Sequence, residues 1–219
     1  MTLQRAGGIA ALICAATYVF GFVLMLSVLL PNGFGASDPD PAQILGFLAD
    51  HRGLMTLWYL SIYVVNGIFL LVLAIALFDL FRPDIPGLAQ VTLGFGTLWA
   101  TLVIGAGMVA NVGLADVLLL NQTDPDRAAE VWQMVNTIEN GLGGGNEIVG
   151  GVWVLLLGVA GLLAGAVSKP LSILGIVIGV AGLSTVLPAL SEPMGAVFGL
   201  GFIAWFAWVG VALLRRRTA

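Results

Sequence analysis

Residues 54–77 read LMTLWYLSIYVVNGIFLLVLAIAL, a run in which no side chain is charged. At a rise of about 1.5 Å per residue, a helix of this length is longer than the ~30 Å thickness of the hydrocarbon core of a bilayer. A helix also pairs its own backbone amides and carbonyls, which a chain surrounded by lipid has to do. The stretch therefore predicts a transmembrane helix.

Five more apolar stretches surround this one, and every break between them carries charged residues or proline. The protein has 219 residues, of which 59% are hydrophobic and 9% charged, whereas about a quarter of a soluble domain is charged. We therefore expect an all-α, polytopic membrane helix bundle that forms a single domain over residues 1–219. Its six predicted crossings are residues 7–30, 54–77, 88–115, 148–166, 171–190 and 195–214. The first run is longer than the apolar region of a signal peptide, so we expect it to be retained.

The charged residues separate between the two sides that this segmentation defines. Six of the eight Lys and Arg residues fall on the side of the termini, and ten of the twelve acidic residues fall on the other side. Basic loops stay in the cytoplasm. The pattern predicts a protein of the bacterial inner membrane with both termini cytoplasmic and an acidic outer face. The basic residues on the predicted inner side are Arg5, Arg82, Lys169, Arg215, Arg216 and Arg217.

The counts of reactive residues exclude several kinds of chemistry. Cys14 and His51 are the only residues of their types, so neither a disulfide within the chain nor a multi-histidine metal or haem centre can form. We therefore expect no metal and no cofactor. The absence of a basic stripe with interleaved aromatic residues argues against nucleic acid as a partner. No P-loop, kinase loop or nucleophile elbow is present either.

The two longer outer loops each contain the start of a helix. Asp40 and Asp124 each precede a proline, an arrangement typical of an N-cap followed by a first-turn proline. The helix after Asp40 should bury Ile44, Leu45, Leu48 and Ala49. The helix after Asp124 is predicted to be amphipathic and either to lie flat on the outer surface or to cap the bundle. Its apolar face should be Ala128, Val131, Trp132, Val135, Ile138 and Leu142.

The densest polar stretch, residues 139–147, reads ENGLGGGNE and leads into the fourth predicted crossing. In one interpretation, Glu147 offsets the positive end of the helix dipole and the glycines allow a sharp turn. In the other interpretation, Asn146 and Glu147 border a ligand site, where a partly desolvated carboxyl group binds a cation or exchanges a proton. The sequence leaves both interpretations open.

Two predicted crossings carry polar side chains that can join this site. Tyr59, Tyr63 and Asn66 are spaced i, i+4 and i+7, so they form one stripe on the second crossing, and Asn111 lies on the third. Amides in the hydrocarbon region need partners. Hydrogen bonds between helices would satisfy Asn66 and Asn111, whereas the alternative is an outward-facing cavity lined by the stripe together with Asn111, Asn146 and Glu147.

Pairs of glycines four residues apart recur in the last three predicted crossings, at 161/165, 175/179 and 195/199. This spacing permits close contact between helices. We expect such contacts within the chain, and the same glycine-rich faces can support a homo-oligomer.

Three stretches resemble a family of small multi-pass bacterial membrane proteins that is classed as a domain of unknown function. They are GGNEIVGGVWVLL at 144–156, the region from Gly175 to Pro188, and AVFGLGFIAWFAW at 196–208; the opening RAGGIAAL at 5–12 is similar as well. The resemblance covers nearly the whole chain. It implies a six-helix fold in the bacterial inner membrane, and it carries no activity or site residues.

Besides the lipid bilayer, the partner that these patterns favour is a small molecule or lipid, bound from the outer side. The candidate ligand-binding residues are Tyr59, Tyr63, Asn66, Asn111, Asn146 and Glu147. Three alternatives remain open: a cation- or proton-coupled carrier, an intramembrane enzyme with Glu147 as acid or base, and a scaffold without catalytic activity. No midmembrane charge of the kind that ion pumps use is evident.

Overall fold

The computed structural model describes residues 2–36, 39–144 and 146–216, and this part of the chain contains helices and no strand. The all-α prediction is therefore confirmed. The helical elements, in order, are α1 (Leu3–Leu24), η1 (Met25–Leu29), η2 (Leu30–Asn32), α2 (Pro41–Asp50), α3 (Arg52–Tyr59), η3 (Leu60–Val65), α4 (Asn66–Phe81), α5 (Pro86–Leu120), α6 (Pro125–Glu139), η4 (Asn140–Gly144), α7 (Ile148–Ala164), α8 (Lys169–Ser184) and α9 (Ser191–Arg215).

Five helical stretches of the described chain are long and apolar enough to cross a membrane. One of them joins the amphipathic α6 to α7 across a kink at Gly143. The predicted crossing 171–190 corresponds to α8, which is apolar but has only 16 residues. A multi-pass helical bundle is thus confirmed, while the count of six crossings remains a prediction. The five stretches are Leu3–Asn32, Arg52–Phe81, Pro86–Leu120, Pro125–Ala164 and Ser191–Arg215.

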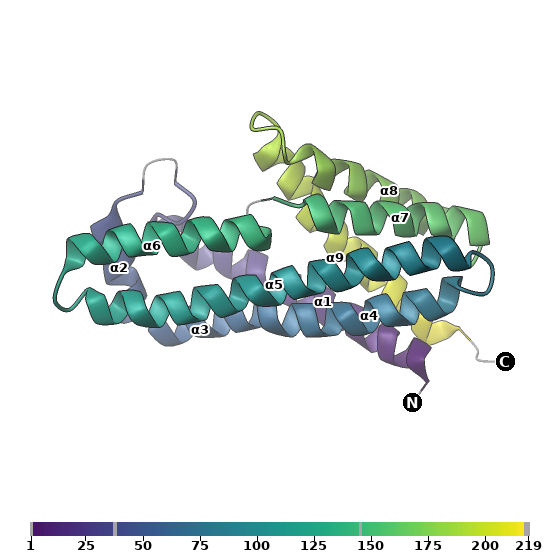
Figure 1. The fold of residues 1–219 in the computed structure, drawn as a ribbon, viewed down its shortest axis with the longest axis horizontal. Helices are drawn as coiled ribbons and strands as arrows, with labels where there is room; N and C mark the ends of the chain where they lie inside the picture. The colour runs from purple at the N-terminus through teal and green to yellow at the C-terminus, as the bar shows by residue number, and fades with distance from the viewer. Residues whose placement is uncertain (1, 37–38, 145, 217–219) are drawn as a thin grey trace.

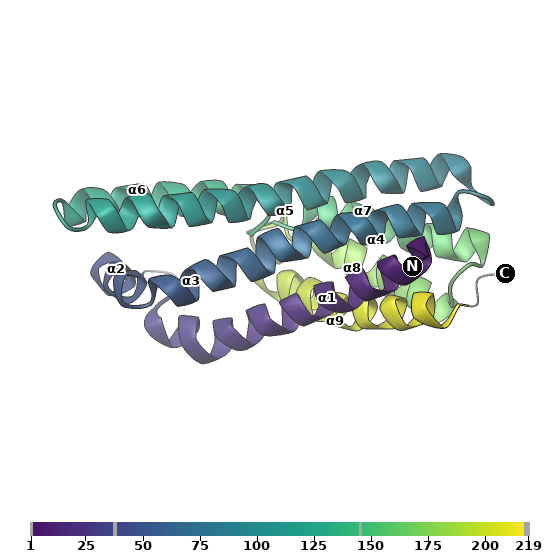
Figure 2. The ribbon, with the colours of Figure 1, turned by 90° about the horizontal axis from the view of Figure 1, so that it is seen from below.

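The long helices extend beyond the short ones at one end of the molecule (Figures 1 and 2). With 35 residues, α5 is about 52 Å long, whereas α7, with 17 residues, is about 26 Å long. The C-terminal half of α5 and the α3–η3 segment therefore project past the α7–α9 lobe, and α2 and α6 pack beside them. Both described ends of the chain lie at the opposite end of the molecule (Figure 1).

Two hydrophobic cores follow from this shape. One fills the bundle, where Trp99, Trp153 and Phe202 are buried between α5, α7 and α9. The other lies at the projecting end, where Leu48 of α2, Met55 of α3 and Trp132 of α6 are buried beside the last turns of α5. The second core holds the outer helices in place, so the side chains of α6 that face inward have defined positions.

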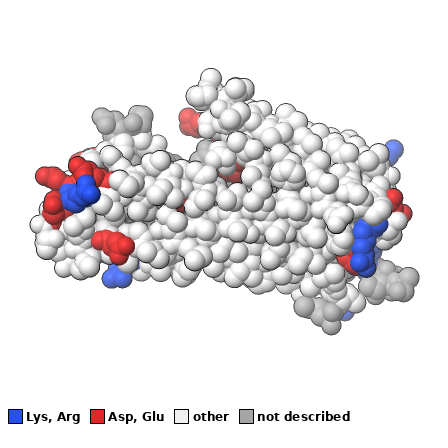
Figure 3. Space-filling model, viewed as in Figure 1, with Lys and Arg blue, Asp and Glu red and all other residues white. Residues whose placement is uncertain are grey.

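Most charged side chains lie at the two ends of the molecule, and a broad band with few charged side chains separates them (Figure 3). Many large apolar side chains of this band are exposed, among them Val23, Leu26, Val112 and Leu163. A soluble protein would hide such a surface. The band is the surface that lipid covers in a multi-pass membrane protein.

The paired glycines 175 and 179 lie in the contact between α7 and α8. A Cβ atom on Gly179 would lie 2.4 Å from the Cβ of Leu155, and one on Gly175 would lie 3.2 Å from the carbonyl oxygen of Val154. The predicted close helix contact is therefore present within the chain at this pair. Gly165 instead ends α7 in a left-handed conformation with φ of 63°, and homo-oligomer formation remains a prediction.

The fifth predicted crossing extends too far toward its outer end. Helix α8 stops at Ser184, six residues before the predicted limit, and short turns follow up to Leu190. The physical reason is Pro188, which cannot donate a backbone hydrogen bond and disfavours the helical conformation of Leu187. The proline therefore follows the helix end instead of kinking the helix.

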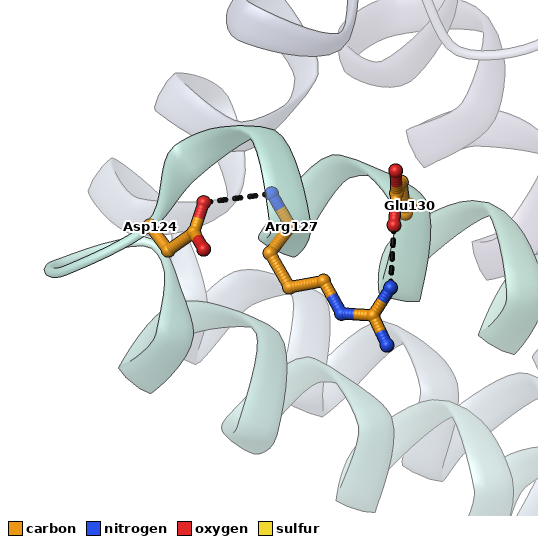
Figure 4. A network of polar contacts seen from close by, with 3 residues as sticks. All are labelled: Asp124, Arg127 and Glu130. Carbon is orange, nitrogen blue, oxygen red and sulfur yellow. Dashed lines mark hydrogen bonds and ion pairs between the residues drawn. The ribbon is translucent and has the colours of Figure 1, made fainter.

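Both predicted N-caps are present. The carboxylate of Asp40 accepts a hydrogen bond from the amide of Ala42 at 2.9 Å, and that of Asp124 accepts one from the amide of Arg127 at 3.0 Å. On α6, the guanidinium of Arg127 also pairs with Glu130 on the exposed surface (Figure 4). These contacts define where the two outer helices begin.

The buried faces of α2 and α6 differ from the predicted ones at four positions. In α2, Phe47 is buried and Ala49 is exposed. In α6, Ile138 is half exposed, and Glu139 is buried in its place. The reason is that α6 lies alongside α5 as an antiparallel neighbour (Figures 1 and 2) instead of flat across the end of the bundle, so its inward face points to α5 and contacts α2 as well.

Candidate functional site

A pocket of about 280 Å³, here called the lateral pocket, lies where the projecting helices meet the α7–α9 lobe. Figure 3 shows a hollow in this region with acidic atoms inside it. The pocket is lined by residues of α1, η1, α3, η3, α4, α5, η4 and α9 and by the link before α7. The residues that define it here are Phe22, Trp58, Tyr63, Asn66, Glu147 and Phe198.

Glu147 reaches the lateral pocket because the chain turns sharply before α7. Gly143 leaves the helical conformation (φ 156°, ψ 12°), and the backbone amide of Glu147 donates a hydrogen bond to Oγ1 of Thr185 at 3.0 Å. Thr185 in turn donates to the carbonyl of Gly182 at 2.7 Å. The end of α8 therefore holds the backbone of Glu147. No hydrogen bond from another described residue reaches its carboxylate.

Asn66 borders the lateral pocket, and its side chain is held by α1. Its Nδ2 donates to Oγ1 of Thr17 at 2.8 Å, and Thr17 donates to the carbonyl of Cys14 at 2.9 Å. Asn66 is 1% exposed. This arrangement is the interhelical hydrogen bond that the sequence left open, so the amide has a structural role and its position at the pocket wall is defined.

A second cavity of about 320 Å³, here called the outer cavity, lies between α2, α3 and α6 at the projecting end. Met25, Trp58 and Tyr63 line both cavities, so the lateral pocket and the outer cavity share part of a wall. The residues that define the outer cavity here are Trp58, Tyr59, Tyr63, Trp132, Asn136 and Glu139.

The carboxylate of Glu139 accepts a hydrogen bond from the hydroxyl of Tyr63. Glu139 is 8% exposed, and among the described residues no Lys or Arg side chain forms an ion pair with it. The Tyr59 and Tyr63 rings are nearly parallel, with centroids 6.3 Å apart. A buried acid thus lies beside aromatic rings without a cationic partner in the described part of the protein.

Irregular helical turns contribute to both cavities. The π-helical segment η1 provides Met25, η3 provides Tyr63, and the kinked η4 provides Gly143 and Asn140. Segments of this kind occur often at functional sites, because they redirect side chains that a regular helix would place elsewhere. Parts of the walls of the lateral pocket and of the outer cavity are thus formed by interruptions in otherwise regular helices.

The structure brings together three of the six predicted site residues, Tyr63, Asn66 and Glu147, at the lateral pocket. Tyr59 lines the outer cavity instead. Asn111 lines neither cavity, and its Nδ2 donates to the carbonyl of Gly107 in its own helix at 2.9 Å. Asn146 precedes Glu147 in the non-helical link and also lines neither one.

Glu139 is the main residue of these cavities that the sequence prediction did not place there. Glu139 lies seven residues after Trp132, so the two side chains share one face of a helix. This spacing was the feature of the sequence that could have predicted an inward-facing Glu139. An acidic side chain at the end of an amphipathic helix would ordinarily face water.

The described residues contain no group of three or more His, Cys, Asp or Glu side chains that could hold a metal ion.

The exposed apolar band, the bundle of long helices and the two cavities define a multi-pass helical membrane protein. A family profile described as Domain of unknown function (DUF4386) matches residues 6–216. The chain therefore belongs to this family, as the sequence resemblance implied. Comparisons with curated proteins and with solved structures found no match.

Proposed function

We propose that this protein binds a small amphiphilic molecule or lipid from the outer side of the membrane, in the lateral pocket. The observation that carries the proposal is a single carboxylate, Glu147, at a cavity whose other walls are mainly apolar and aromatic. Ligand sites have this composition, with few polar groups that set the orientation of the ligand. The size of the pocket fits a single chain or a small ring system.

Access from the bilayer follows from the surroundings of the pocket. Gly21 and Phe22 of α1 and Gly195 and Gly199 of α9 line it. Next to them along the same helices, Val23 and Leu200 are more than half exposed, at 60% and 58%. An apolar ligand can therefore move from lipid into the pocket without crossing water, while its polar head lies near Glu147 at the outer end of α7.

The alternatives receive less support from the same geometry. An enzyme that uses Glu147 as acid or base would place a second polar group within hydrogen-bonding distance of its carboxylate, and the described residues provide none. A scaffold would pair its buried amides and leave no cavity; Asn66 is paired, but the lateral pocket remains open.

We further propose that the end bearing the termini faces the cytoplasm of a bacterial cell.

The test uses the full protein in lipid nanodiscs and a pocket-filling variant. A Cβ atom on Gly195 would meet no atom within 4 Å, although this glycine lines the lateral pocket. Gly195→Leu should therefore fold and fill the pocket. Gly94→Leu is the matched control, because Gly94 is equally unobstructed and lies on the exposed face of α5, away from the pocket.

The probes are dodecylamine, dodecanol and dodecanoic acid, and the readout is the midpoint of thermal unfolding. We expect dodecylamine and dodecanol to stabilise the unsubstituted protein and Gly94→Leu, because both heads can donate a hydrogen bond to Glu147. A ligand at a free concentration of 100 times its Kd raises the free energy of unfolding by about 2.7 kcal/mol. Gly195→Leu should abolish this effect, and Glu147→Gln should reduce the effect of dodecylamine. The proposal is wrong if no probe stabilises the protein or if Gly195→Leu responds as the control does.

A further inference from the structure

We propose that the outer cavity is a binding site for a small organic cation, an ammonium group with apolar substituents, with Glu139 as its counter-ion. This site is separate from the amphiphile site proposed for the lateral pocket and does not depend on it. The two share part of a wall, but the acidic residue and most of the lining residues differ.

The first argument is that the buried carboxyl group of Glu139 has no cationic partner among the described residues. A carboxylate buried away from water is stable when it is hydrogen-bonded and paired with a cation. Tyr63 supplies a hydrogen bond, but no Lys, Arg or His side chain of the described residues lines the outer cavity. The protein therefore holds an acid at the wall of a cavity in which a positively charged ligand would complete the pairing.

The second argument is the aromatic lining. Trp58, Tyr59, Tyr63 and Trp132 all border the outer cavity, and the Trp58 and Tyr59 rings lie 5.2 Å apart, tilted by 52°. Aromatic faces attract ammonium groups through the quadrupole of the ring, and groups of such rings bind quaternary ammonium ligands. An anionic ligand would be repelled by both the rings and Glu139. The lining therefore selects for positive charge joined to apolar groups.

The third argument is the charge of the projecting end of the molecule. Acidic side chains at this end include Asp40, Asp124 and Asp126, at the starts of α2 and α6. A net acidic surface raises the local concentration of cations and their rate of association. The Asn136 and Gln133 side chains at the cavity edge add neutral polar groups that can contact a hydroxyl or a carbonyl of the ligand.

The experiment measures the binding of choline and of its neutral isostere 3,3-dimethylbutanol at constant ionic strength. Trp58 and Trp132 line the cavity, so tryptophan fluorescence of the full protein in nanodiscs reports occupancy. We expect choline to bind saturably and the isostere to bind at least tenfold more weakly. Glu139→Gln, which keeps the shape of the side chain and removes its charge, should weaken choline binding at least tenfold.

The matched control is Glu130→Gln, which removes an acidic residue from the exposed face of the same helix, where Glu130 pairs with Arg127. It should change choline affinity less than twofold. Because Glu139→Gln alters a buried residue, Asn136→Lys serves as a second variant: Asn136 is exposed at the cavity edge, and a lysine there supplies the missing cation from within the chain. It should also weaken choline binding at least tenfold.

Three results would overturn the inference: no saturable choline binding to the unsubstituted protein, equal binding of the isostere, or equal losses in Glu139→Gln and Glu130→Gln. The ammonium group can come from a soluble compound or from a lipid head group. If ethanolamine head groups occupy the cavity, choline should bind several-fold more weakly in phosphatidylethanolamine nanodiscs than in uncharged galactolipid nanodiscs. Equal affinity in the two lipids would indicate a soluble ligand.

Discussion

Asn66 illustrates how a polar residue in an apolar helix acquires its role from its neighbours. Its amide donates to Thr17 of α1, while the thiol of Cys14 donates to the backbone carbonyl of Asn66 at 3.7 Å. Helices α1 and α4 are therefore joined by side-chain contacts at Asn66, which borders the lateral pocket. The lipid environment offers no driving force from water for such packing, so hydrogen bonds and close fit carry more of the association.

We expect Asn66→Ala and Thr17→Val each to lower the stability of the protein, because each removes one partner of a buried hydrogen bond. In a double-mutant cycle the coupling between the two should be about 0.6 kcal/mol and at most ~1.7 kcal/mol, the range found for such bonds in membrane bundles. The measurement is reversible unfolding in mixed micelles. Strictly additive losses would show that the hydrogen bond contributes nothing.

Glu139 and Glu147 show why acidic residues were the hardest side chains to place from the sequence. Both flank the same glycine-rich stretch, and only Glu147 was predicted at a site. The direction in which the Glu139 side chain points depends on the orientation of α6 about its own axis relative to α5. At their contact, Val135 lies so close to Gly113 that a Cβ atom on this glycine would be 2.5 Å from Cγ1 of Val135. No pattern within α6 alone specifies that rotation.

At the scale of elements, the contact between α7 and α8 depends on small residues on both helices. Gly151 and Gly158 of α7 face Gly179 and Ser172 of α8, and an added Cβ atom at any of these glycines would lie within 3.0 Å of the other helix. The two helices can approach this closely because the glycines carry no side chain there. Their contact also sets the position of Thr185, which holds the backbone of Glu147.

Gly179→Ala should therefore destabilise the protein by about 1–3 kcal/mol, the usual result of overpacking. The clash is with the Cβ of Leu155 and the carbonyl oxygen of Gly151, neither of which can move alone. Gly94→Ala is the control: it meets no atom within 4 Å and should be neutral or stabilising by up to ~1 kcal/mol. Thermal unfolding of both variants measures whether Gly179→Ala lowers the stability and Gly94→Ala does not.

The irregular segments η1, η3 and η4 were not predicted, although they lie at the cavities. Hydropathy and helical period describe residues 54–77 equally well with or without a π-helical turn at Leu60–Val65. The turn forms where Tyr63 and Val64 pack against Gly107 of α5. Its presence is thus a consequence of packing between helices, and only the assembled bundle reveals it.

At the scale of the whole molecule, the charge distribution predicts how the protein is oriented. The two described ends of the chain, Thr2 and Arg216, lie at the same end of the molecule (Figure 1), opposite to α2 and α6. Lys169 begins α8 at the same end as the termini, and Gln122 lies in the turn between α5 and α6 at the other; both are exposed. These two positions distinguish the two sides of the membrane.

We expect a membrane-impermeant maleimide to label Gln122→Cys in intact spheroplasts, and Lys169→Cys only after the membrane is permeabilised, because basic loops remain in the cytoplasm. The unsubstituted protein is the control, since its Cys14 is buried. Labelling of Lys169→Cys but not of Gln122→Cys before permeabilisation would reverse the proposed orientation. Labelling of both positions without permeabilisation would contradict the proposed number of crossings.

The sequence by itself determined that the chain is helical and apolar, where its main helices lie and where α2 and α6 begin. These properties depend on composition, period and local caps, which act over a few neighbouring residues. The tertiary structure decided that Trp153 and Trp205 are buried while Trp208 is exposed, that Asn111 bonds within its own helix, and that Glu139 turns inward beside Tyr63. Such choices depend on the rotation and spacing of helices distant in the chain, and an apolar helix can pack through any of its faces.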